Sequence, residues 1–312
     1  MVSQIKNKLE KEISNPTKII RFNRNHIFYD LKSMIIDNSD KESLIDLYYC
    51  FSLYEKCLKL CQSNNLDLAS YWFSKIDQVH SKLSNNILQY LQILYIPCLA
   101  FYHYKNENFK TAIELLSVEM NNADLLLKSN KSLKLEIKLE QLINKYRVFV
   151  TSKDYRNSIS LANNIIDFVI NSRNFDDIPN DDISCIKSEN IENYLNWINF
   201  LIDNIIIKIQ FHKHISDQEK ERIYYNIFGN ITCVENEEFV HLNNAFQAIK
   251  YYYEKNDEKF LKYTYVAFEE IYKLPINIQQ VLLNFLIKRE KLDSQLHEEY
   301  LARVLEIKQL TY

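Results

Sequence analysis

The chain almost lacks glycine. Gly229 is the only one in 312 residues, whereas average usage of about 7% would give roughly 20. Dinucleotide fingerprints and phosphate-binding loops need several glycines where the backbone approaches phosphate, and two-residue β-hairpins need them for positive φ angles. This scarcity excludes both kinds of phosphate site and disfavours a protein of many strands. The sequence therefore predicts an all-α protein.

Proline, closely paired cysteines and long apolar runs are also scarce. The chain has four prolines, and none of its six cysteines forms a C-x-x-C pair. The most apolar segment, residues 88–102, is shorter than the roughly 20 residues that a membrane span needs, and residues 1–15 lack the apolar core of a secretory signal. Cys50, Cys57 and Cys61 share one helix face, which indicates buried, reduced thiols. We therefore expect a cytoplasmic protein with no membrane partner.

The chain as a whole has no large excess of positive or negative charge. The formal net charge is −3, which gives no field that attracts nucleic acid. Residues 1–32 are locally basic and residues 173–192 are locally acidic. We interpret them as a solvated helix face and an acidic loop, so nucleic acid is not an expected partner.

Helical periodicity is the dominant pattern in the sequence. Apolar residues recur at intervals of three and four, which predicts about 14 helices joined by short polar turns. Two short helices are expected before residue 40. The longer ones are expected over residues 44–61, 66–79, 88–102, 109–120, 135–149, 155–169, 189–211, 216–228, 237–254, 257–272, 276–289 and 293–309.

One segment, residues 174–187, interrupts this pattern. It contains Pro179 and four aspartates and has no helical period, which is typical of a loop. The predicted organisation is therefore an N-terminal helical-repeat region over 1–173, an acidic linker over 174–187, and a C-terminal helical region over 188–312 that packs on the first.

Three stretches of the chain align on their turns. In each, a large residue follows the turn and a small residue lies three positions later, where it lets two helices approach closely. The aligned turns are 64–65, 106–107 and 152–153, and the paired residues are Leu66 with Ala69, Phe109 with Ala112, and Tyr155 with Ser158. A weaker fourth match has its turn at 256–257.

This pattern resembles the tetratricopeptide repeat, which has units of about 34 residues. Phe109 and Ala112 match the family's aromatic and small residues best, although its glycines and terminal proline are absent here. The resemblance implies antiparallel helix hairpins stacked as an α-solenoid with a concave, peptide-sized groove. An irregular globular helical bundle is the alternative architecture.

The resemblance also implies that the first helix of each pair contributes residues to the groove. Tyrosine is rigid and amphipathic and is enriched at binding surfaces. We therefore expect the partner-binding groove to include Tyr54, Tyr95, Tyr102 and Tyr146. On a later helix, Asn196 and Asn199 share one stripe, and their amides are candidates for hydrogen bonds to an extended peptide.

Two motifs are candidates for metal binding. Asp77 with His80 and Glu238 with His241 have a spacing of three residues, which places a carboxylate and an imidazole on one helix face. Helical di-iron proteins use Glu-x-x-His units of this kind. Isolated pairs arise easily in a charged chain, so we expect no metal or other cofactor and assign no catalytic residue.

The sequence thus favours a non-enzymatic helical-repeat protein that binds a peptide or protein partner as a scaffold, adaptor or regulator. Stacked repeats expose an extended concave surface suited to recognition. Two alternatives remain open, an all-α metal-dependent enzyme and a ligand-sensing regulatory protein.

Overall fold

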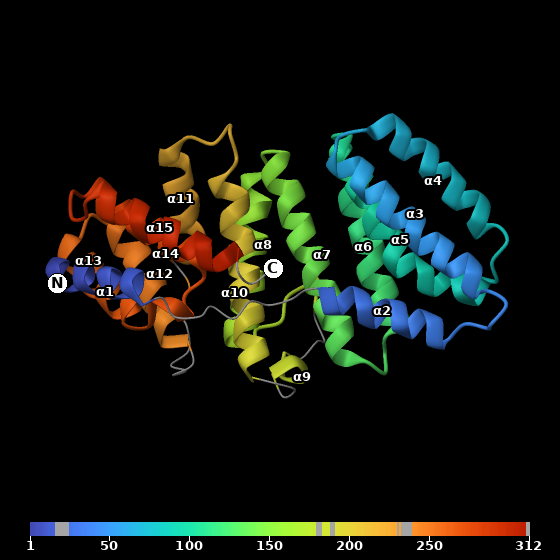
Figure 1. Ribbon diagram of the computed structural model, residues 1–312, viewed down its shortest axis with the longest axis horizontal. Helices are drawn as coiled ribbons and strands as arrows, with labels where there is room; N and C mark the ends of the chain where they lie inside the picture. Colours follow the sequence, from blue (N-terminus) through green and yellow to red (C-terminus); the bar gives the residue numbers. More distant parts are fainter. Residues whose placement is uncertain (16–24, 179–182, 188–190, 230, 232–238, 310–312) are drawn as a thin grey trace. The chain divides into compact units, whose positions relative to one another are not determined.

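The computed structural model describes residues 1–15, 25–178, 183–187, 191–229, 231 and 239–309 (Figure 1). Within these residues every regular element is a helix and no strand occurs, which confirms the all-α prediction. The elements are α1 (Val2–Ser14), α2 (Asn25–Asp37), α3 (Leu44–Gln62), α4 (Leu66–His80), α5 (Asn85–Lys105), α6 (Phe109–Leu126), α7 (Lys131–Thr151), α8 (Tyr155–Asn171), α9 (Ser184–Lys187), α10 (Ile191–Gln210), α11 (Asp217–Phe228), α12 (Val240–Tyr253), α13 (Asp257–Ala267), the 3₁₀ helix η2 (Phe268–Lys273), α14 (Ile276–Lys288) and α15 (Ser294–Gln309).

Two compact units make up the described chain. Unit 2 consists of Asn23–Ser158 with Ser184–Ile186, and unit 1 consists of Met1–Phe22, Ile159–Ile183 and Lys187–Tyr312. Residues 179–182 of the predicted linker lie outside the described residues. The division of the chain into regions 1–173 and 188–312 stays a prediction.

Unit 2 is built mainly from consecutive helices that pack on one another. Contacts join α3 with α4, α5 with α6, and α6 with α7, while α3 also contacts α5. Helix α2 packs against α5 and α7 (Figure 1). Cys50, Cys57 and Cys61 are fully buried free thiols on α3, as their spacing predicted.

The turns that end α3, α5, α7, α12 and α14 share one backbone conformation. In each, the N–H that follows a residue with positive φ donates to the carbonyl five residues earlier, as Asn65 does to Leu60 at 2.9 Å. This is the Schellman arrangement, which glycine usually completes. Here non-glycine residues adopt the left-handed conformation, namely Asn64 (φ 60°), Glu107 (φ 61°), Lys153 (φ 64°), Lys255 (φ 59°) and Glu290 (φ 55°).

Unit 1 contains α1, most of α8, and α10 to α15. Consecutive contacts join α11 with α12 and α12 with α13, and α1 packs on α13 and α15 (Figure 1). Ser216 and Glu219 form a reciprocal capping box at the start of α11, as their spacing indicated. The predicted helix 257–272 is shorter than expected, because α13 ends at Ala267 and the following 3₁₀ segment contains the non-helical Glu270.

The single glycine, Gly229, does not adopt the left-handed conformation of these turns. Gly229 ends α11 with φ −69°, a conformation open to any residue. A Cβ at this position would lie 2.8 Å from the Tyr225 carbonyl oxygen and 2.9 Å from a carbon of its ring. Glycine is therefore needed here for close approach rather than for backbone freedom.

Candidate functional site

Residues from both candidate lists of unit 2 meet in one network, in which Tyr54, His80 and Tyr95 are buried and Asp77 is exposed. The Tyr54 hydroxyl and His80 Nε2 are hydrogen-bonded at 2.6 Å, and the Tyr95 hydroxyl donates to Asp77 Oδ1 at 3.1 Å. The rings of His80 and Tyr95 also pack edge to face, with centroids 4.9 Å apart. Helices α3, α4 and α5 are thereby linked through polar groups inside their apolar interface.

Burial sets the protonation states in this network. It raises the pKa of Tyr54 and Tyr95, and it lowers the pKa of His80 despite the nearby Asp77 carboxylate. Burial also raises the pKa of the Cys50 and Cys61 thiols to about 11. A neutral imidazole, neutral phenols and protonated thiols are suited to packing rather than to nucleophilic chemistry.

The structure places three of the four predicted groove tyrosines within the helix packing. Tyr54, Tyr95 and Tyr146 are buried, because the apolar spacing that places them on one helix face directs that face into the helix packing. Burial removes these three rings from the candidate partner surface. Tyr102 is half-buried and its ring packs on Phe73 with centroids 5.2 Å apart.

The two predicted asparagines lie on α10 in unit 1. Asn199 Nδ2 donates to the Lys273 carbonyl at 2.9 Å, so this amide connects α10 to the end of η2. The side chain of Asn196 lies outside the described residues. No hydrogen bond to a peptide is assigned to either residue.

The metal candidates fall in different units. Asp77 and His80 belong to unit 2, His241 belongs to unit 1, and Glu238 lies outside the described residues. His241 is buried, and burial, followed by the nearby Lys273, lowers its pKa to about 4. In the part of the chain that the structure describes, no group of three or more His, Cys, Asp or Glu side chains could hold a metal ion.

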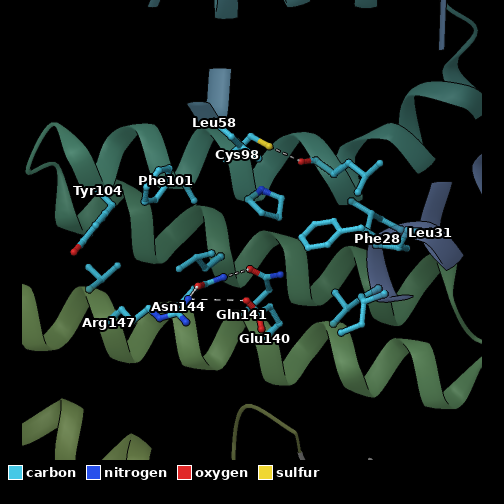
Figure 2. Close-up of a pocket in the computed structure, with 18 of the residues that line it drawn as sticks. Phe28, Leu31, Leu58, Cys98, Phe101, Tyr104, Glu140, Gln141, Asn144 and Arg147 are labelled. Atoms are coloured by element: carbon cyan, nitrogen blue, oxygen red, sulfur yellow. Dashed lines mark hydrogen bonds and ion pairs between the residues drawn. The ribbon is translucent and has the colours of Figure 1, made fainter. Parts of the chain in front are cut away.

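A pocket of about 240 Å³ lies within unit 2, between α2, α3, α5 and α7. Phe28 is 41% exposed and Gln62 is also exposed, so the pocket reaches the surface. Figure 2 shows an apolar wall facing a polar one. The apolar wall includes Phe28 and Leu31 of α2, Leu58 of α3, and Pro97, Cys98 and Phe101 of α5, whereas the polar wall consists of Glu140, Gln141, Asn144 and Arg147 of α7.

The polar wall is a chain of oriented hydrogen bonds. Arg147 Nη1 donates to Asn144 Oδ1 at 2.7 Å, and Asn144 Nδ2 donates to Gln141 Oε1 at 3.2 Å (Figure 2). Glu140 Oε1 lies 4.0 Å from Arg147 Nη1. Because residues three and four apart share a helix face, this row forms one continuous strip along α7.

Sequence reasoning missed this strip. Polar residues at such intervals on a helix usually mark its solvent-exposed face. Here the placement of α2 and α5 makes the buried Gln141 and the half-buried Asn144 part of a pocket wall. Pro97 was a usable signal, because a proline inside the apolar segment 88–102 is unusual in a helix interior.

Comparisons with known proteins give no match, whether with family models, curated proteins or solved structures. None of the helices in the described part of the chain combines the length and apolar composition that crossing a membrane requires.

Proposed function

We propose that this chain is a helical-repeat protein that binds a peptide or protein partner, as a scaffold, adaptor or regulator, and that recognition occurs at the unit 2 pocket. The observation that carries the proposal is the pairing of an apolar wall with the amide-rich strip on α7. An apolar wall suits a side chain, and fixed amides suit the hydrogen-bonding groups of a peptide backbone.

The helix packing supports a tetratricopeptide-like arrangement in unit 2. The small residues Ala69 and Ala112 are fully buried, as expected where two helices of a pair approach closely. The first helices of two successive pairs, α3 and α5, contact each other. The same left-handed turn also ends α3, α5 and α7, which supports a repeated helix–turn–helix unit.

The size of the pocket favours a peptide over a larger small molecule. Small-molecule sites commonly occupy about 300–1,000 Å³, and this pocket of about 240 Å³ is smaller. A single large apolar side chain fits this volume, while the rest of a peptide follows the surface outside it.

Selection from a library of random linear peptides displayed on phage tests the proposal directly. The full chain is immobilised, enriched peptides are synthesised, and their Kd values are measured by isothermal titration calorimetry. Phe28→Asp places a charge on the apolar wall and is expected to weaken binding by about tenfold or more.

Tyr29→Asp is the matched control for this substitution. Tyr29 is also an exposed aromatic residue of α2, at 69% exposure, and it does not line the pocket. Its substitution is expected to leave the Kd unchanged. A selection that enriches no peptide, or equal Kd values for wild type and Phe28→Asp, would refute the proposed function.

A further inference from the structure

The Gln141 side chain has one amide donor that is free to meet a ligand. Gln141 is 5% exposed and lies on the pocket wall. Its Oε1 accepts from Asn144 Nδ2, but the described residues offer its Nε2 no acceptor. This donor lines the pocket and stays available, so a ligand that supplies an acceptor could bind to it.

Arg147 determines which end of each amide faces the pocket. A guanidinium has only donors, so Asn144 must present Oδ1 to Arg147 and Nδ2 to Gln141. Gln141 must then present Oε1 to Asn144, which leaves Nε2 on the opposite side, as Figure 2 shows. Because the chain of bonds begins at a cation, each donor along it is strengthened.

The facing wall offers the complementary group. Pro97 lies inside α5 and has no N–H, so the Ile93 carbonyl loses its donor four residues later. Ile93 and Pro97 both line the pocket. The Ile93 carbonyl therefore lacks its usual helical donor in a segment that lines the pocket opposite Gln141.

We propose that the pocket binds one large apolar side chain of a peptide together with the two backbone groups that flank it. The peptide carbonyl accepts from Gln141 Nε2, and the peptide N–H donates to the Ile93 carbonyl. This assignment rests on the proposed function and specifies how the peptide is recognised. One peptide residue carries a C=O, an N–H and a side chain, and these three groups would use the Gln141 donor, the Ile93 carbonyl and the apolar wall.

Two variants separate these contacts from folding. Gln141→Met keeps the length of the side chain but removes its amide, and it is expected to raise the Kd of an enriched peptide about 5- to 100-fold. Pro97→Ala restores the N–H within α5 and occupies the Ile93 carbonyl. It is expected to weaken peptide binding while raising the unfolding temperature, since proline is the least favourable residue in a helix interior.

A modified peptide tests the Ile93 contact. The enriched peptide is resynthesised with an ester in place of the amide whose N–H precedes the apolar residue. The ester is expected to bind wild type several-fold more weakly than the amide does, whereas ester and amide are expected to bind Pro97→Ala equally. Gln78→Met, an exposed α4 substitution outside the pocket, serves as the control for Gln141→Met.

The outcomes distinguish this assignment from the proposed function. Suppose that peptides are enriched and that Phe28→Asp weakens their binding, but that Gln141→Met and Pro97→Ala bind them with the wild-type Kd. The recognition mode is then refuted and the proposed function stands. The same conclusion follows if replacing the apolar residue of the peptide by alanine leaves the Kd unchanged. If no peptide is enriched, the function and the recognition mode both fail.

Discussion

Glu119 lies on α6, is fully buried, and provides a test of stability that is independent of ligand binding. Neither of its carboxyl oxygens has a hydrogen-bond partner among the described residues. Burial raises its pKa well above the ordinary value of 4.5. A buried polar group without a partner costs about 1–3 kcal/mol. We therefore expect Glu119→Met, which fills similar space without a polar group, to raise the free energy of unfolding by about 1–3 kcal/mol near neutral pH.

The pH dependence follows from the same burial. The protonated carboxyl is favoured in the folded state, so the unfolded chain loses its proton first as the pH rises through 4.5. The free energy of unfolding then falls, by at most about 1.4 kcal/mol per pH unit, until the folded-state pKa is passed. Glu119→Gln keeps an unpaired polar group but does not ionise, so it is expected to remove this fall without the full gain of Glu119→Met.

Urea unfolding followed by far-ultraviolet circular dichroism at several pH values measures these differences. Glu114→Met is the control, because Glu114 is exposed on the same helix and its ion pair with Lys110 is long, at 3.9 Å. Its effect is expected to stay within about 0.5 kcal/mol. A Glu119→Met variant less stable than wild type near neutral pH, or a stability difference that does not grow with pH, would contradict the reasoning.

Three further predictions concern backbone geometry and histidine burial. Gly229→Ala is expected to lower stability by about 1–3 kcal/mol in thermal unfolding, because its Cβ would lie 2.8 Å from the Tyr225 carbonyl oxygen. Lys153→Gly relieves a positive φ of 64° and is expected to raise stability by up to about 1 kcal/mol in urea unfolding. Burial lowers the pKa of His241 to about 4, so its contribution to stability is expected to be lost as the pH falls from 6.5 to about 4, and a His241→Gln titration should lack this loss.

Helix positions were predictable from the sequence because each helix must direct an apolar face inward. The turns expected at 64–65, 106–107 and 152–153 are present, with positive φ at Asn64, Glu107 and Lys153. The end of α13 at Ala267 was not predictable, because apolar spacing continues through η2. Periodicity reports which residues share a face and does not report where the backbone departs from helical angles.

The site was less predictable for a related reason. Spacing placed Tyr54 and Tyr95 on the first helices of their pairs, but it does not distinguish a face that meets another helix from one that meets a partner. Both rings are buried with their hydroxyls hydrogen-bonded. The strip of Gln141 and Asn144 becomes a pocket wall only because α2 and α5 line the same cavity as α7, and no local sequence pattern reports this tertiary arrangement.

Two features of the unit 2 pocket leave hydrogen-bonding groups without a partner in the described part of the chain. Pro97 interrupts the hydrogen bonds of α5, and Gln141 keeps a donor without an acceptor among the described residues. Pro97 lowers the stability of α5, and one substitution would remove each feature. Local conflicts of this kind are expected where function opposes stability. Because the two lie on facing walls and are complementary in hydrogen bonding, a ligand that supplied one acceptor and one donor would resolve both, and this complementarity supports peptide recognition here over a purely structural role for the pocket.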